Sequence, residues 1–412
     1  RGGLGAAATG LRPARHARVA EMQRCALAMQ QRCGGLGVAK PISEAQDDRV
    51  ADLVGCPAFP LHFLSFAVGG VAPAPAEPPV LRSREAGGIG IRHRFERRAE
   101  RDAALPEALR PPREGLPLLC RPCPVPTAVG LEPWGVAARR LLDERLKQHP
   151  AVLLSGLPIA SAEDFASFVR GLGYASVERH GVSERQVYAE KVFGASDDVP
   201  ADFCLTPHNE QAYLPPDASP TYPRKLFFCC LQPAAKGGET PVALNAEVHA
   251  ALDPAVLAKF ERLGVRYRQI LVSGPRDAPM EQNLGGKQSW QKRFETEERP
   301  EAERACRASG LEWRWLEDGG LEVTSAARPA LHPAHGTWFN QSHNPYSFEP
   351  LYGDGSPVEE EVMEHITAAF WANSVAFRWS PGDVLCLDNE RATHARLSFE
   401  PPRRVLCAFS AE

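Results

Sequence analysis

Short apolar segments bounded by turn residues constrain the fold of this chain most. They occupy residues 225–231, 240–244, 265–272, 376–379, 383–387 and 404–409. Segments of this length between proline, glycine and aspartate predict β-strands, and the Ser-Pro-Gly-Asp turn at residues 380–383 is typical of their boundaries. Many short strands with helices inserted between them predict a mainly β fold of the α+β class, a double-layered jelly-roll barrel with its helices packed outside.

Helices are predicted wherever apolar side chains recur at helical spacing. The five stretches are residues 134–148, 161–173, 246–263, 289–308 and 357–373. The second stretch has the clearest boundaries, because Ser161 and Asp164 can form a capping box and Gly173 can end the helix. A buried strand at residues 151–157 is predicted just before it.

The first 117 residues differ from the rest in composition. They are rich in glycine, alanine, arginine and proline, and only residues 56–71 are continuously apolar. Such a segment buries too little surface to offset the ordering of the chain, which costs roughly 1–2 kcal/mol per residue. We therefore predict that residues 1–117 are a low-complexity, disordered segment and that residues 118–412 form one domain. The arginine- and alanine-rich start is also typical of an organelle transit peptide.

Charge and cysteine content narrow the partners and the compartment. The formal net charge of -4 provides no global attraction to nucleic acid or to an acidic membrane surface. No run of about 18 apolar residues is present, so a membrane-spanning helix is not predicted. The 11 cysteines show no repeated pairing pattern, which favours a reducing, intracellular compartment such as the cytoplasm. Cys120 and Cys123 form a single C-x-x-C motif without the second pair of a zinc site. The oligomeric state is left open.

His208 and Glu210 lie two residues apart in an apolar, strand-like neighbourhood. In an extended segment both side chains point to the same face and can reach one ion. Alone, the pair is more typical of a strand-end histidine beside an acid than of a metal site. His394, in the C-terminal stretch, offers a third ligand. Two histidines and one carboxylate leave three coordination positions open, an arrangement that suits non-haem Fe(II) oxygenases.

A metal of this kind needs a co-substrate. A 2-oxo acid fills two open positions and leaves the third for O₂, and its far carboxylate then needs a cationic partner. Arg404 begins the last predicted strand and offers a planar two-point fork, and Thr240 offers a hydroxyl donor. Arg403 should point to the opposite strand face from Arg404, which makes it the weaker candidate. Arg396 is a further candidate helper.

Taken together, these residues resemble the TauD/TfdA (taurine dioxygenase and clavaminate synthase-like) family of Fe(II)/2-oxoglutarate-dependent oxygenases, from about residue 152 to residue 409. The likeness rests on five motifs in matching order: His208-Asn-Glu210, Gly237-Gly-Glu-Thr-Pro-Val-Ala243, Trp338-Phe-Asn-Gln341, Tyr352-Gly-Asp-Gly-Ser356 and Gly382-Asp-Val-Leu-Cys-Leu-Asp-Asn389.

The resemblance implies a double-stranded β-helix core, the clavaminate synthase-like form of the jelly roll. It implies that His208, Glu210 and His394 bind iron and that Thr240 and Arg404 hold 2-oxoglutarate. The implied activity is that of a dioxygenase, which uses Fe(II), 2-oxoglutarate and O₂ to hydroxylate a small-molecule substrate and releases succinate and CO₂.

Three positions depart from the family pattern. Glu210 stands where aspartate is more common, although the clavaminate synthase branch also uses glutamate. Ala395 stands where glycine commonly follows the distal histidine, and Ala408 replaces a second arginine that many members carry. The co-substrate is therefore expected to depend on Arg404, helped by Arg396 or Arg403.

Other functions remain open from the residues alone. A zinc hydrolase could use the same two histidines and carboxylate, and a catalytically silent jelly roll could act as a binding module. A halogenase is disfavoured, because it replaces the carboxylate ligand with a small residue. Trp338, Phe339 and Asn340 are predicted to line the pocket or to belong to the core. We interpret His332, His335 and His343 as structural or exposed, without partners at ligand spacing.

Overall fold

The computed structural model describes residues 64–75, 109–124, 129–177, 185–196, 199–214, 222–275, 289–343 and 348–412. The chain divides into two compact units, Arg1–Phe59 with Ala67–Gly69, and Pro60–Phe66 with Gly70–Glu412. Only Ala67–Gly69 of the first unit is described, as part of strand β1 (Phe66–Val68) and the residue after it. All that follows concerns the second unit.

Order in the second unit begins before residue 118. Ala72 and Leu116 belong to its main hydrophobic cluster, and Leu109 is buried in a neighbouring one. These short segments were predicted as part of the low-complexity region, and the rest of that region lies outside the described residues. The boundary at residues 117 and 118 therefore stays a prediction for the remainder.

A large sheet forms one layer of the core. Its strands are ordered β2 (Leu118–Pro122), β3 (Ala151–Leu154), β13 (Val384–Asp388), β7 (Lys225–Gln232), β15 (Arg404–Ser410), β5 (Val192–Gly194) and β4 (Val187–Ala189). All neighbours are antiparallel except β2 and β3. The central strands are apolar along their length because both faces are covered, so they were readily predicted.

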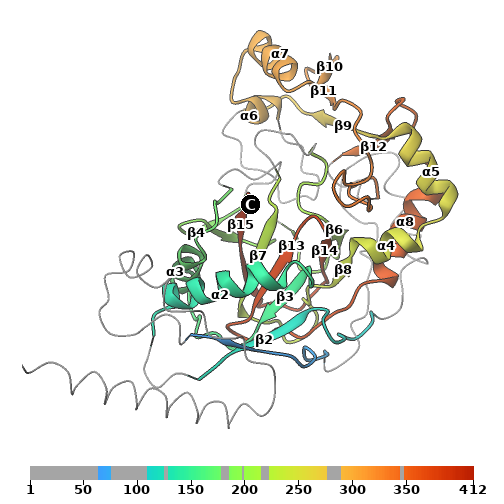
Figure 1. The fold of residues 1–412 in the computed structure, drawn as a ribbon. Helices are drawn as coiled ribbons and strands as arrows, with labels where there is room; N and C mark the ends of the chain where they lie inside the picture. Colours follow the sequence, from blue (N-terminus) through green and yellow to red (C-terminus); the bar gives the residue numbers. More distant parts are fainter. Residues whose placement is uncertain are drawn as a thin grey trace, which may run out of the picture. The chain divides into compact units, whose positions relative to one another are not determined.

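A smaller sheet forms the second layer. Strand β14 (Ala392–Arg396) lies between β6 (Leu205–His208) and β8 (Val242–Leu244), antiparallel to both. Val242 and Ala392 of this sheet share one hydrophobic cluster with Phe228 and Leu385 of the large sheet. Figure 1 shows the two sets of strands side by side in the centre of the molecule. The predicted jelly-roll, double-stranded β-helix core is confirmed.

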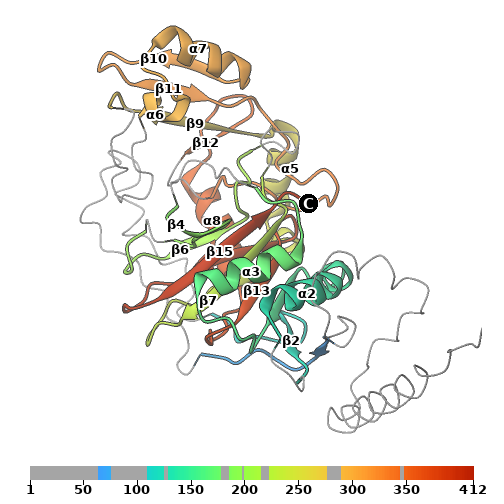
Figure 2. The ribbon, with the colours of Figure 1, turned by 90° about the vertical axis from the view of Figure 1, so that its left-hand side faces the viewer.

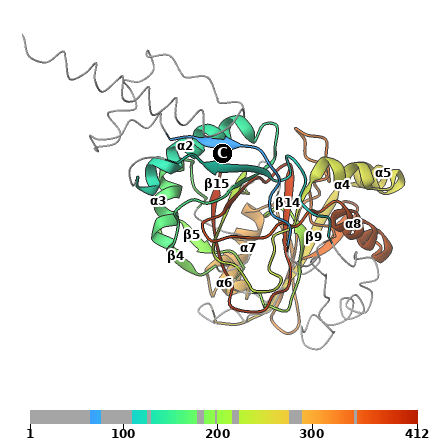
Figure 3. The same cartoon turned by 90° about the horizontal axis from the view of Figure 1, so that it is seen from below.

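Two groups of helices flank the sheets. Helices α2 (Leu131–Arg145) and α3 (Ala162–Leu172) lie over the large sheet (Figure 2). Viewed from below, α4 (Asn245–Ala251), α5 (Pro254–Leu263) and α8 (Glu360–Ala372) lie on the opposite side (Figure 3). Among the described residues, every helix is too short or too polar to cross a membrane.

The helix ends follow local sequence signals. The predicted capping box of α3 is present, and its C-cap residue Gly173 has a φ of 63°. The single helix predicted over residues 246–263 is instead divided into α4 and α5. Pro254 cannot continue a preceding helix, and the side chain of Asp253 caps the new one by accepting a hydrogen bond from the Ala255 N–H.

A third sheet projects from the core. It is ordered β10 (Glu312–Trp315), β11 (Leu321–Thr324), β9 (Val265–Leu271) and β12 (Glu349–Tyr352), and α6 (Trp290–Phe294) and α7 (Arg299–Ala308) pack on it. Residues 265–272 were predicted as a barrel strand, but β9 belongs to this sheet. Residues 376–379, also predicted as a strand, belong to no strand.

Candidate metal and co-substrate site

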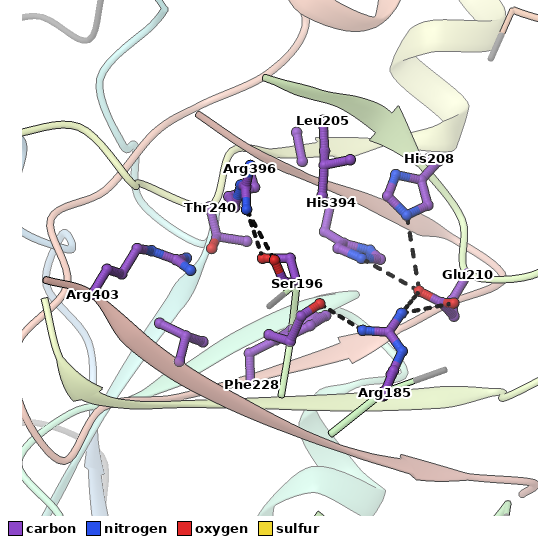
Figure 4. A pocket seen from close by; sticks show the side chains of 13 residues that line it. Arg185, Ser196, Leu205, His208, Glu210, Phe228, Thr240, His394, Arg396 and Arg403 are labelled. Atoms are coloured by element: carbon purple, nitrogen blue, oxygen red, sulfur yellow. Dashed lines mark hydrogen bonds and ion pairs between the residues drawn. The ribbon is translucent and has the colours of Figure 1, made fainter. Parts of the chain in front are cut away.

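The structure brings His208, Glu210 and His394 together on the small sheet. His208 ends β6 and lies directly opposite His394 of β14, with ring centroids 4.4 Å apart. Glu210 follows in the turn after β6, and its Oε2 lies 3.9 Å from His208 Nε2 and 3.8 Å from His394 Nε2. Figure 4 shows all three side chains converging on one point. Three donor atoms at this spacing can enclose one small cation.

Two buried asparagines fix the backbone of this turn. Asn389 accepts a hydrogen bond from the Glu210 N–H at 2.7 Å and donates to the Glu210 carbonyl at 3.0 Å. Asn209 donates to the carbonyls of Asn389 and Ala392 at 2.6 and 3.1 Å. Glu210 is therefore presented by a hydrogen-bonded turn rather than by the extended strand that was predicted. Asn389 is the last residue of the motif at residues 382–389, and this was the only indication in the sequence that it matters to the site.

The orientation of His208 and the protonation of His394 and Glu210 suit a divalent metal. His208 donates from Nδ1 to the Thr206 carbonyl at 2.8 Å, which orients the ring with Nε2 facing Glu210. Burial and the neighbouring His208 hold the pKa of His394 well below its usual range, so this ring is neutral. Burial acts to raise the pKa of Glu210, but Arg185 and His208 outweigh it and keep the carboxylate ionised.

This donor set fits Fe(II). Two neutral imidazoles and one carboxylate are the ligands of the facial triad, and each of them must be deprotonated to bind metal. The Nδ1 atom of His394 is buried and has no hydrogen-bond partner among the described residues. One Glu210 oxygen, Oε2, lies 3.9 and 3.8 Å from the Nε2 atoms of His208 and His394, close enough for a single ion to contact all three.

Arg185 completes this end of the pocket and was missed from the sequence. Its Nη2 lies 3.2 and 3.3 Å from the two oxygens of Glu210, and its Nη1 donates to the Ala195 carbonyl at 2.5 Å. Arg185 lies in the chain just before β4, 25 residues ahead of Glu210. No motif spacing connects the two positions, so only the fold shows that they meet.

The pocket extends from this cluster to Thr240 and Arg403. It has an empty volume of about 380 Å³. Thr240 accepts a hydrogen bond from Trp379 Nε1 at 3.1 Å, and Arg403 donates from Nε to the Gly238 carbonyl at 2.8 Å. Figure 4 places both residues at the opposite end of the pocket from Glu210. The Arg403 guanidinium and the Thr240 hydroxyl therefore line the end of the pocket away from Glu210. There they could bind the far carboxylate of a ligand that chelates a metal at the other end.

Arg404 does not line this pocket, which corrects the prediction from the sequence. Arg403 and Val405 both line it, whereas Arg404 between them is exposed, with its guanidinium 5.7 Å from the Tyr188 ring centroid. Successive residues of a strand point to opposite faces. The sequence predicted Arg404 as the co-substrate ligand, whereas the structure places Arg403 in the pocket wall and Arg404 outside it.

Arg396 lines the pocket but is held by the backbone. Its guanidinium donates to the carbonyls of Val199, Pro200 and Phe203 at 3.1, 2.6 and 2.8 Å. These bonds tie the loop before β6 to β14. We therefore assign Arg396 a structural role in shaping the pocket wall rather than a role in holding the co-substrate.

The aromatic motif predicted to line the pocket or to belong to the core belongs to the core. Trp338 and Phe339 are fully buried in two hydrophobic clusters, and Asn340 donates to the Ala330 carbonyl at 2.8 Å. His343 is also buried and stacks on Phe370, with Nε2 2.8 Å from the Pro207 carbonyl oxygen.

Burial raises the pKa of the Cys120 thiol to about 12, so the C-x-x-C motif has no thiolate there at neutral pH.

A second cluster joins His332 and His335 to Glu390, so the prediction that these histidines lack partners at ligand spacing was wrong. Their Nε2 atoms lie 3.4 and 3.5 Å from the two Glu390 oxygens. His332 Nδ1 accepts the Ala334 N–H at 3.2 Å, so the neutral ring carries its proton on Nε2. A protonated nitrogen cannot bind a metal. The cluster is therefore a hydrogen-bond network around Glu390, to which Tyr222 also donates at 2.8 Å.

We expect this network to stabilise the protein at neutral pH. Burial acts to raise the pKa of Glu390, but the hydrogen bonds from His332 and Tyr222 outweigh it and lower the pKa to about 2. Glu390→Gln should therefore reduce the free energy of unfolding by about 1–2 kcal/mol at pH 7. A lowered pKa contributes stability above the unfolded value near 4.5 that is lost as pH falls towards 2.

Urea unfolding at pH 7, pH 5 and pH 3.5 would measure this difference. The gap between wild type and variant should be smaller at pH 3.5 than at pH 5. The matched control is Glu400→Gln, which breaks an exposed ion pair with Lys236 and should change nothing measurable. An equal gap at pH 5 and pH 3.5 would contradict the role assigned to the carboxylate.

Comparisons with known proteins find a matching family and similar relatives. The model of the family described as "Taurine catabolism dioxygenase TauD, TfdA family" matches residues 128–409. The dapdiamide synthesis protein DdaC of Enterobacter agglomerans is 30% identical over 294 residues, which cover 65% of this chain and 84% of that protein. The clavaminate synthase-like protein At3g21360 of Arabidopsis thaliana is 30% identical over 289 residues, covering 66% and 84%. The solved structure of PvcB from Pseudomonas aeruginosa aligns with a TM-score of 0.43 at 17% identity, covering 72% of this chain and 86% of that one.

Proposed function

This chain belongs to the TauD/TfdA family of Fe(II)- and 2-oxoglutarate-dependent dioxygenases, and on that premise we propose that His208, Glu210 and His394 bind its iron. One observation carries the proposal. The same carboxylate oxygen of Glu210 lies within 3.9 Å of the Nε2 atoms of both histidines, with the carboxylate ionised and the His394 ring neutral, as a metal requires.

The co-substrate then extends from the metal ligands towards Arg403. A 2-oxo acid that chelates the metal through its keto end leaves its far carboxylate near Arg403 and Thr240, which line the same pocket. The guanidinium can bind both oxygens of that carboxylate, and the Thr240 hydroxyl can donate a further hydrogen bond. Arg403 takes the role that the sequence had assigned to Arg404, and Thr240 keeps its predicted role.

The protein contributes orientation and shielding. When bound, Fe(II) and 2-oxoglutarate supply the oxygen chemistry, in which the co-substrate is released as succinate and CO₂. His208 is oriented by the Thr206 carbonyl, and Glu210 by Arg185 and by the Asn389 side chain. Phe228 packs 4.8 Å from the His394 ring and restricts water on that side. We propose that the primary substrate is a small molecule and that it is hydroxylated.

The zinc hydrolase and the silent binding module account for fewer of these residues. Either could use the two histidines and the carboxylate, but neither needs a cation and a hydroxyl at the far end of the pocket. The family to which the chain belongs consists of dioxygenases, which favours the iron enzyme over both.

We expect the purified protein, loaded anaerobically with Fe(II), to form succinate from 2-oxoglutarate once O₂ is admitted. Turnover without a primary substrate should be slow, and a panel of small carboxylates and amino acids should identify molecules that accelerate it. The same protein loaded with Zn(II) is the control and should form none. Absence of iron-dependent succinate across the whole panel would contradict the proposed function.

A further inference from the structure

We propose that Arg185 is a positioning residue that keeps one oxygen of Glu210 away from the metal, so that this ligand binds through a single oxygen. The inference rests on the proposed function, in which Glu210 is a ligand. The carboxylate is approached from two sides. Both imidazole Nε2 atoms approach Oε2, at 3.8 and 3.9 Å, whereas the guanidinium contacts Oε1 at 3.2 Å and also reaches Oε2, at 3.3 Å.

Arg185 is itself held firmly. Its Nη1 donates to the carbonyls of Ala195 and Gly194 at 2.5 and 3.4 Å, and its guanidinium carbon lies 5.3 Å from the Phe409 ring centroid. Gly194 and Phe409 belong to β5 and β15 of the large sheet. Figure 4 shows the guanidinium reaching from that side of the pocket to Glu210. The large sheet therefore fixes the orientation of a ligand that the small sheet carries.

The length of Glu210 explains why such a restraint is useful. Glutamate has one more rotatable bond than the aspartate that is more common at this position in the family, so its carboxylate can turn more freely. Two histidines and one oxygen leave three of six positions open. A second Glu210 oxygen on the metal would leave only two, too few for a chelating 2-oxo acid and O₂ together. Hydrogen bonds to a ligating carboxylate commonly set its orientation.

Arg185 could act through its positive charge or through the geometry of its guanidinium. The two possibilities predict different binding constants, so the variants must separate them. Removing a cation beside the site reduces repulsion of Fe(II) and weakens attraction for the dianionic co-substrate, whatever the geometry. Lysine keeps the charge but replaces the planar fork with a point charge on a flexible stem. Methionine removes both the charge and the fork and keeps an apolar stem of similar reach.

The experiment compares wild type, Arg185→Lys, Arg185→Met and the control Arg404→Met, whose side chain is exposed outside the pocket. Two dissociation constants are measured without O₂: that of Fe(II), by competition with a chelating dye, and that of 2-oxoglutarate, from the visible absorption of its Fe(II) chelate. Both Arg185 variants should bind Fe(II) at least as tightly as wild type. Both should bind 2-oxoglutarate about 10-fold or more weakly, in the range found when partners of metal ligands are removed. Arg404→Met should match wild type in both.

Several outcomes would overturn the inference. Wild-type 2-oxoglutarate binding by Arg185→Lys would show that only the charge of Arg185 matters. A loss of Fe(II) affinity in both variants would show that Arg185 is needed to build the site as a whole. Unchanged 2-oxoglutarate binding in both variants would remove any role for Arg185. If wild type itself forms no Fe(II)-dependent complex with 2-oxoglutarate, the proposed function fails and the inference fails with it.

Discussion

Replacing His394 with alanine should abolish iron-dependent succinate formation, with a loss greater than about 100-fold, because removing even an outer partner of a metal ligand costs 10- to 100-fold. His394 lies at the centre of β14, between β6 and β8. Glu210→Ala should lose as much. Both variants should also fail to retain stoichiometric Fe(II), measured as metal content after anaerobic desalting.

A matched histidine variant controls for effects on stability. His335→Ala removes a half-exposed ring that contacts Glu390 outside the pocket, and it should keep at least half of wild-type turnover. Circular dichroism melting of each variant would show whether the fold is intact. Retention of wild-type Fe(II) content and turnover by a folded His394→Ala protein would contradict the assignment of this residue as a ligand.

The strands that hold the core were easier to predict than the strands that hold the site. Strands β7, β13 and β15 are apolar between their end residues because they are covered on both faces, and their bounds were predicted to within one residue. The site strands β6 and β14 carry polar side chains, including His208, His394 and Arg396, and β6 contains a proline. Residues selected for chemistry thus obscure the strand pattern that would reveal the element carrying them.

The same contrast applies within the site. His208, Glu210, His394 and Thr240 lie in or next to motifs with fixed order, so the sequence was sufficient to propose them as site residues. Arg185 lies in no such motif. It meets Glu210 only because β5 and β15, which it contacts, pack against the small sheet in the folded chain. The Glu390 network was missed for the same reason, since the turn after β13 meets the loop at residues 332–335 only in the folded chain.

The choice between Arg403 and Arg404 can be tested directly. Arg403→Ala should weaken 2-oxoglutarate binding by about 10- to 150-fold, equivalent to the 1.5–3 kcal/mol typical of a hydrogen bond to a charged group. Arg404→Ala should change it by less than about 2-fold, because an exposed side chain outside the pocket makes no contact with the ligand. Anaerobic titration of the Fe(II)-loaded proteins measures both constants.

A second ligand separates loss of the carboxylate contact from general damage to the pocket. 2-Oxopentanoate has the same chain length as 2-oxoglutarate but lacks the far carboxylate. Wild type should strongly prefer 2-oxoglutarate, because the analogue leaves the Arg403 cation facing an apolar chain end. Arg403→Ala should lose most of this preference, whereas Arg404→Ala should keep it. If Arg404→Ala instead lost the preference and Arg403→Ala kept it, the outward placement of Arg404 would be incorrect, and the assignment made from the sequence would stand.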